Sequence, residues 1–372
     1  MAGRRAPLSV LDLSPFGSGE RPRDGLAHTL DLAREAESFG YARYWLAEHH
    51  ANPGIAGAAP HVLAAAVLAA TRRIRVGTAA TIVGNRSALQ VAEETGLLGA
   101  LSGGRFDLGI GRSGSSRLAG GPKPPAGIPD RVVDGLAVPA PRLLDVDAIR
   151  FAVQRRLLGR EDGDADAFPE VVDTILAFLR GDYVADEGIA IPATPAHDHG
   201  GVQVWLHGSS AGPTARLAGA LGLRFGANYH VAPAFVIEAV RAYRDAFVPS
   251  PEVPEPYVIV SADVLVARTG TAAERIAAGY SEWVLSIRAG GGAIPYPRPE
   301  DALARTWTDA EEEVVRDRTA TRFVGAPPTV VERLETLQRA TGADELLVTT
   351  IAHDHDARVG SYRLLADAWG AA

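Results

Sequence analysis

The first 112 residues of this 372-residue chain alternate regularly between short apolar runs and helical segments. Pro7–Leu13 predicts a buried strand, and a helix follows from about residue 24 to 39, where Gly40 suits its C-terminus. Further strands are expected at 42–47, 74–80 and 105–111, with helices at 60–70 and 88–101. This alternation predicts a parallel sheet with crossover helices. On its own it does not separate a closed barrel from an open doubly wound sheet.

The alternation resumes after a long interruption. Residues 113–144 are rich in Gly, Pro, Ser and Arg and are predicted to form a loop, which at this length is typical of a lid or a disordered segment. Thr329 and Glu332 are spaced as a capping box for a helix that starts near Val330. Beyond the loop we expect strands at 202–206, 224–228, 257–267 and 345–350, and helices at 146–158, 169–179, 214–221, 330–341 and 358–369. With no linker, residues 1–372 are expected to form one domain.

Composition excludes several classes of function. The absence of cysteine excludes disulfides, thiolate metal sites and a cysteine nucleophile. The formal net charge of −8 and the lack of a basic patch argue against a nucleic-acid partner. The most apolar stretch, residues 58–70, is too short to span a bilayer. We therefore expect a cytoplasmic protein with no membrane segment.

The candidate ligand-binding residues lie where the expected strands end, because parallel α/β folds bind ligands at the carboxyl ends of their strands. Gly208-Ser209-Ser210 precedes a predicted helix N-terminus, which suits a phosphate, although helix capping is the alternative role. Arg112 would add a charge-assisted contact. The full set at these ends is Ser14, Glu48, His49, His50, Thr78, Ala79, Ala80, Gly111, Arg112, Ser113, His207, Gly208, Ser209 and Ser210.

Two His-Asp-His runs, residues 197–199 and 353–355, raise the possibility of a metal-dependent hydrolase. Neither run stands at a strand end together with a further histidine or carboxylate, so no metal site is expected. Asp354 or Asp356 is expected to cap a helix instead.

Five segments carry a family resemblance through their order along the chain. They are 45–50 (Trp-Leu-Ala-Glu-His-His), 74–80, 103–112, 206–210 and 325–337. Together they resemble the bacterial luciferase-like flavin-dependent monooxygenases, over nearly the whole chain except about 115–144. The resemblance implies a TIM-type (β/α)8 barrel with insertions. It also implies reduced FMN from a separate flavin reductase, addition of O2 at the flavin C4a position to give a (hydro)peroxyflavin, oxygenation of a small organic substrate, and a homodimer.

The resemblance also assigns roles to single residues. His49 matches the active-site histidine, and His50 beside it is the second catalytic candidate. A histidine titrates near neutral pH, so it can act as a general base or a proton donor. Arg112 matches an arginine that holds the flavin phosphate, and the turn His207-Gly208-Ser209-Ser210 caps that phosphate. Ala79 and Ala80 match the backbone that passes under the isoalloxazine.

The sequence departs from the family pattern at two places and leaves alternatives open. Gly111 stands where luciferase carries a cysteine, so light emission is not implied, and residues 83–89 lack the prolines and histidine that relatives often show. The loop at 113–144 is expected to be a lid. Alternatives are a deazaflavin-dependent hydride-transfer oxidoreductase and a non-catalytic flavin-binding protein. The Glu48-His49-His50 and His207–Ser210 patterns favour the FMN enzyme. Tyr229 and His230, after the 224–228 strand, are candidates for a substrate-side role.

Overall fold

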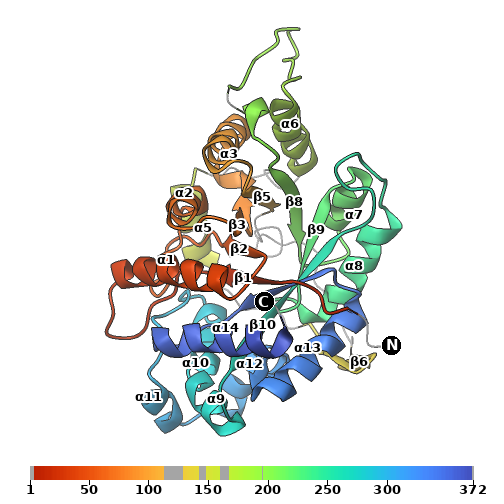
Figure 1. Cartoon of the computed structure of the whole chain (residues 1–372). Helices are drawn as coiled ribbons and strands as arrows, with labels where there is room; N and C mark the ends of the chain where they lie inside the picture. Colours follow the sequence, from red (N-terminus) through yellow and green to blue (C-terminus); the bar gives the residue numbers. More distant parts are fainter. Residues whose placement is uncertain (1–3, 113–128, 142–147, 160–166, 195, 371–372) are drawn as a thin grey trace.

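Eight parallel strands close into a barrel in the computed structural model, which describes residues 4–112, 129–141, 148–159, 167–194 and 196–370. Around the barrel the order is β1-β2-β3-β5-β8-β9-β10-β12, and β12 pairs with β1. Figure 1 shows the helices arranged around the outside of these strands. The strands are β1 (Leu8–Asp12), β2 (Arg43–Leu46), β3 (Arg75–Thr78), β5 (Phe106–Gly111), β8 (Gln203–Gly208), β9 (Arg224–Asn228), β10 (Val258–Val266) and β12 (Glu345–Thr349). The predicted (β/α)8 barrel is confirmed, and the open sheet is excluded.

The strands are buried on both faces, which is why they read as nearly continuous apolar runs. Inward side chains such as Trp45, Trp205 and Leu347 form one apolar cluster inside the barrel. Outward side chains such as Tyr44 and Leu346 belong to a second cluster beneath the helices. Alternate residues of each strand therefore face the barrel interior, and this parity decides which side chains can reach a site at its carboxyl end.

Most helices match the sequence prediction to within about three residues, and one helix start was wrong. The last but one helix begins at Pro327, with Ala326 as its N-cap, so Thr329 and Glu332 form no capping box. Two prolines open this helix because its first turn leaves backbone N–H groups without intrahelical acceptors in any case. Outside the insertion described below, the helices are α1 (Pro22–Ser38), α2 (Pro60–Ala70), α3 (Ala88–Ser102), α5 (Ala148–Leu157), α6 (Phe168–Arg180), α7 (Pro213–Ala220), α8 (Val236–Asp245), α13 (Pro327–Thr341) and α14 (His355–Trp369).

The predicted loop at 113–144 contains a β-hairpin, so that prediction was wrong for part of its length. Strands β6 (Arg131–Val133) and β7 (Leu136–Val138) join through Asp134-Gly135, whose φ angles of 49° and 86° suit a tight hairpin turn. The hairpin is fixed to the barrel wall, because the Tyr229 hydroxyl donates a hydrogen bond to the Ala137 carbonyl oxygen at 2.7 Å. Residues 113–128 and 142–144 lie outside the described residues, and the lid stays a prediction.

An insertion between β10 and α13 was not predicted. It contains α9 (Gly270–Ala277), α10 (Tyr280–Arg288), α11 (Pro299–Ala304), α12 (Asp309–Ala320) and β11 (Phe323–Gly325), and β11 pairs with the end of β10. A buried ion pair joins α10 to α12, with Arg288 Nη2 at 2.8 Å from Asp317 Oδ2. This insertion brings α10 and α12 to the carboxyl end of the barrel.

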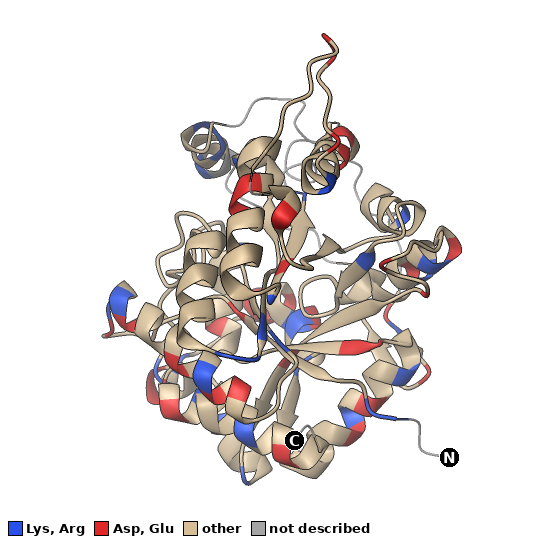
Figure 2. Ribbon diagram, turned by 45° about the horizontal axis from the view of Figure 1, so that its top comes forward, with Lys and Arg blue, Asp and Glu red and all other residues tan. Residues whose placement is uncertain are grey.

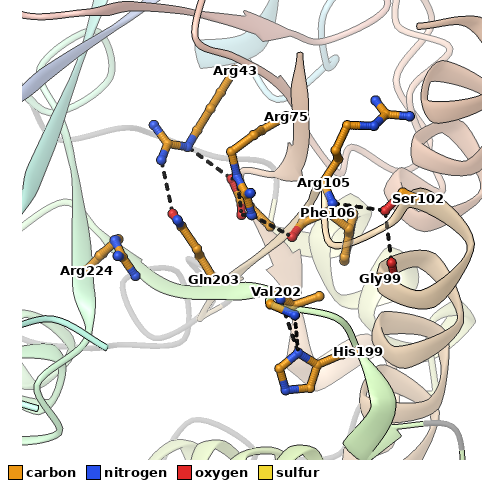
Figure 3. Close-up of polar contacts among 12 residues, drawn as sticks. Arg43, Arg75, Gly99, Ser102, Arg105, Phe106, His199, Val202, Gln203 and Arg224 are labelled. Atoms are coloured by element: carbon orange, nitrogen blue, oxygen red, sulfur yellow. Dashed lines mark hydrogen bonds and ion pairs between the residues drawn. The ribbon is translucent and has the colours of Figure 1, made fainter. Parts of the chain in front are cut away.

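The amino end of the barrel is closed by charged side chains. Arg43 donates to Asp107 and to Gln203, each at 3.0 Å, and Arg75 also donates to Asp107 (Figure 3). The Glu345 carboxylate accepts hydrogen bonds from Arg43 and from Tyr257. Figure 2 shows several charged residues at the centre of the barrel as well as on the outer helices. The open, ligand-accessible end is therefore the carboxyl end.

Candidate active site

A cavity of about 290 Å³ lies at the carboxyl ends of the barrel strands. Its apolar lining includes Leu11, Leu13, Ala47, Ile82, Trp283, Ile287, Leu347 and Ile351. Its polar lining consists of Glu48, His49, Asn228, His230, Asp263, Arg318 and Thr349. Ala79 and Ala80 complete it together with Val231. A mainly apolar cavity with a few converging polar groups is the usual form of a small-molecule site.

Glu48 joins the end of β2 to the segment 82–85, which follows β3 in the chain. Its buried carboxylate accepts hydrogen bonds from the Ile82 backbone N–H at 3.0 Å and from Asn85 Nδ2 at 2.6 Å. His50 Nε2 lies 2.8 Å from Glu48 Oε1, so its ring turns to this carboxylate and does not line the cavity. The predicted pair of histidines is therefore split: His49 faces the cavity and His50 supports Glu48.

His49 presents a neutral imidazole to the cavity. Burial lowers the pKa of His49 to about 4, and the nearby Glu48 opposes that effect only in part. Its Nδ1 atom is buried and has no hydrogen-bond partner among the described residues. The backbone N–H of His49 donates to the Gly57 carbonyl oxygen at 2.9 Å, which fixes the position of the chain here. A neutral ring with a free nitrogen can accept or donate one hydrogen bond.

His230 places a second imidazole in the same cavity. Its Nδ1 lies 2.6 Å from the Ser261 hydroxyl. Burial lowers the pKa of His230 to about 3, and the charges of Arg318 and His49 act in the same direction. The two rings thus titrate far below neutral pH and influence each other's charge.

The Ala79–Ala80 segment lies between β3 and the short strand β4 (Thr81–Ile82), and its peptide bond is cis. Side chains on both sides hold it in place. The Thr81 hydroxyl donates to the Thr78 hydroxyl at 2.9 Å and lies 3.0 Å from Nε2 of the buried His61, which in turn pairs with Glu94 of α3. The two small side chains leave space above this part of the cavity wall.

Arg112 and the Gly208–Ser210 turn lie at neighbouring strand ends. Gly111 of β5 pairs with His207 of β8, so the residues that follow each are adjacent. The turn leads into α7, whose N-cap is Gly212. The Arg112 guanidinium lies 5.9 Å from the ring centroid of Phe168. Neither group lines the cavity, but β5 and β8 are the next strands around the barrel from β3.

His207 lies inside the barrel and does not line the cavity. A Cβ atom on Gly226 would lie 2.2 Å from His207 Nδ1, and one on Gly109 would lie 2.7 Å from Nε2, so glycines on both flanking strands make room for the ring. The ring also contacts Trp45, with centroids 5.5 Å apart. Burial lowers the pKa of His207 to about 4. Its direct contact with a cofactor stays a prediction.

Among the polar cavity residues, the sequence did not single out Asn228, Asp263, Arg318 and Thr349, and Trp283 was missed as well. Trp283 and Arg318 belong to the unpredicted insertion, and no motif or spacing marks them. Asp263 and Thr349 follow the inward parity of β10 and β12, and this parity was the one available signal.

The metal alternative finds no support in the part of the chain that the structure describes. No group of three or more His, Asp or Glu side chains there is arranged to hold a metal ion. Asp354 caps α14, where its side chain accepts from the Ala357 backbone N–H at 2.7 Å. Within the same described ranges, no helix has the length and apolar character needed to cross a membrane.

Comparison with known proteins identifies the family. The family model for luciferase-like monooxygenase matches residues 8–121 and 150–345. The chain belongs to the luciferase-like monooxygenase family. A luciferase-like monooxygenase of Escherichia coli (strain K12) is 31% identical over 367 residues, covering 99% of this chain and 98% of the relative. This luciferase-like protein is therefore an oxidoreductase.

Solved structures share the fold of this chain. The crystal structure of apo-MsnO8 covers 99% of both chains with 32% identity and a TM-score of 0.80. Two further structures share the fold at lower identity. One is the oxygenating constituent of a 3,6-diketocamphane monooxygenase in complex with FMN (TM-score 0.65, 18% identity, 98% of this chain and 97% of that chain). The other is an F420-dependent secondary alcohol dehydrogenase (TM-score 0.60, 15% identity, 98% and 99%).

Proposed function

We propose that this luciferase-like protein is an FMN-dependent monooxygenase. It takes reduced FMN from a separate flavin reductase, and it uses O2 to insert one oxygen atom into a small organic substrate. The observation that carries the proposal is the cavity that brings His49, His230 and the Ala79–Ala80 segment together, next to the strand ends with Arg112 and the Gly208–Ser210 turn. We further propose that the protein acts as a homodimer.

The residues present fit a flavin. The cavity wall contains the buried His49 Nδ1 atom, which has no partner among the described residues, and buried polar atoms are normally hydrogen-bonded. Arg112 and the Gly208–Ser210 turn would hold the phosphate through a guanidinium, hydroxyls and backbone N–H groups. Ala79–Ala80 would support the ring system. When bound, reduced FMN supplies the electrons that activate O2.

The protein's own contribution is proton control and exclusion of water. His49 and His230 are neutral at pH 7, because burial lowers the pKa of each to about 4 and about 3. Each can therefore hold a hydrogen bond to a reacting group without adding charge, and it can take up a proton only from a strongly acidic group. Walls such as Leu13, Trp283 and Ile287 keep the reacting atoms away from bulk water.

Oxygen incorporation tests the proposal directly. The purified protein is mixed with FMN, NADH and a flavin reductase under 18O2 and offered a panel of aldehydes, ketones, thioethers and amines. A product that carries one labelled oxygen atom is expected only when the reductase is present. Hydrogenated, unlabelled products formed with reduced deazaflavin would instead establish the hydride-transfer alternative. Flavin binding without turnover of any compound would favour the non-catalytic alternative.

Replacing His49 tests the assigned role within this reaction. His49→Ala should slow oxygenation by about 10²-fold or more, as loss of a positioned acid or base does. The dissociation constant for reduced FMN should change little, because Arg112 and the serines provide the phosphate contacts. His50→Asn is the matched control, since His50 does not line the cavity. Full activity in His49→Ala would remove this residue from the mechanism.

A further inference from the structure

Arg318 is a buried cation with few partners. Its side chain is 9% exposed, and its Nη2 donates to the Tyr280 hydroxyl at 3.1 Å. Nη2 also lies 3.6 Å from Asp263 Oδ2, beyond ordinary hydrogen-bond length. Its Nε has no partner among the described residues, although a guanidinium carries five N–H donors. A buried donor of this kind calls for an acceptor that the chain itself does not supply.

The cavity supplies the place for that acceptor. Arg318 lines the cavity together with Thr349, whose buried hydroxyl also lacks a partner among the described residues. The surfaces beside them are apolar, with Trp283 and Ile287 from α10 and Ile351 after β12. A ligand bound here would have an apolar body and one oxygen acceptor at the end near Arg318.

The charges around Arg318 decide what kind of acceptor fits. The buried carboxylate of Asp263 lies within 3.6 Å and balances the guanidinium charge. Arg288 and Asp317 neutralise each other at 2.8 Å, and Arg322 stacks on the Tyr280 ring, outside the cavity. A second anion beside Asp263 would be unfavourable in this buried setting. An uncharged acceptor satisfies the free donors without that penalty.

The origin of these residues separates them from the flavin contacts. Arg318, Trp283 and Ile287 come from the 267–326 insertion, whereas the proposed flavin contacts come from the strand ends at β3, β5 and β8. We propose that Arg318, with Thr349, is the specificity-determining anchor for the organic substrate. The substrate class is a compact, mainly apolar molecule with an uncharged oxygen acceptor, such as a ketone, ester or amide carbonyl. This inference rests on the proposed function only in calling that ligand the substrate.

Two ligands of one shape test the anchor. Acetophenone and ethylbenzene differ by a carbonyl in place of a methylene group, and benzoate adds the charged counterpart. Calorimetric or NMR titrations compare the wild-type protein, Arg318→Met and the control Arg322→Met. Arg322 stacks on the same Tyr280 ring but does not line the cavity. Arg318→Met should weaken acetophenone binding by roughly tenfold or more while ethylbenzene affinity is unchanged, as expected for a hydrogen bond to a charged donor. Arg322→Met should leave both ligands unchanged.

Thr349→Val keeps the test open if Arg318→Met fails to fold, because valine has nearly the shape of threonine. Thr349→Val should also weaken the binding of acetophenone and leave the binding of ethylbenzene unchanged. Equal losses for both ligands, or tighter binding of benzoate that disappears in Arg318→Met, would overturn the proposal. A separate titration with reduced FMN distinguishes the two claims. If only the FMN affinity falls in Arg318→Met, Arg318 is a flavin contact and the inference fails. If the wild-type protein does not bind FMN, the proposed function fails while the ligand discrimination can still be measured.

Discussion

Gly226→Ala should destabilise the protein because it forces a methyl group into the imidazole of His207. The new Cβ would lie 2.2, 2.5 and 3.0 Å from three ring atoms of His207. The ring has little room to retreat, since Gly109 on the opposite strand would place its own Cβ within 2.7 Å of Nε2. Overpacking of a buried site costs about 1–3 kcal/mol. We expect a loss of this size in the free energy of unfolding, measured as a lower urea midpoint.

A second substitution tests whether the clash in Gly226→Ala is with the His207 ring. His207→Ala removes the ring, so the double variant Gly226→Ala/His207→Ala should be about as stable as His207→Ala alone, a non-additivity of about 1–3 kcal/mol. Gly109→Ala is the matched control. Its Cβ would lie 1.8 Å from the Thr78 backbone carbonyl oxygen, which the loss of His207 does not relieve. His207→Ala should restore at most part of the stability lost in Gly109→Ala, because the contact with the Thr78 carbonyl oxygen remains. Simple additivity in the Gly226 pair would refute the location of His207 inside the barrel.

Two further predictions follow from the site. Arg112→Ala should weaken binding of reduced FMN by roughly tenfold or more, as loss of a charge-assisted contact does. The control is Arg86→Ala, because the Arg86 guanidinium pairs with Glu94 of α3 and does not line the cavity. Equal affinities of the wild type and Arg112→Ala would remove the phosphate role. The pKa values of His49, His207 and His230, about 4, 4 and 3, lie below the unfolded value near 6.5, so the unfolded state binds more protons in acid. The free energy of unfolding should therefore fall as the pH drops from 6.5 towards 4, by up to about 1.4 kcal/mol per histidine and pH unit. This fall is measured as a lower urea midpoint. His207→Asn should flatten this slope, and a pH-independent midpoint would contradict the burial of the three rings.

Local periodicity in the sequence was enough to predict the barrel and part of its site. The strands are buried runs with clear boundaries, so the position of His49 after β2 and of Ala79–Ala80 after β3 could be predicted. The direction of His207 follows from strand parity, since Trp205 two residues earlier also points inward. The sequence prediction grouped His207 with the phosphate-binding turn that follows it. It did not use the two-residue period of a strand, which directs His207 into the barrel.

Tertiary packing explains what the sequence could not provide. The helices α12 and α10 and the strand β10 bring together Arg318, Tyr280 and Asp263. No spacing in the sequence predicts this contact. The β6–β7 hairpin did carry a signal in Asp134-Gly135, which the surrounding glycines and prolines obscured.

Cofactor choice is the central claim, and an anaerobic titration tests it most directly. The purified protein is titrated with reduced FMN and, separately, with reduced deazaflavin, and Arg112→Ala is carried alongside. The account predicts tighter binding of reduced FMN, by about tenfold or more, with that advantage lost in Arg112→Ala. Preference for the deazaflavin, or FMN affinity that does not depend on Arg112, would contradict the account.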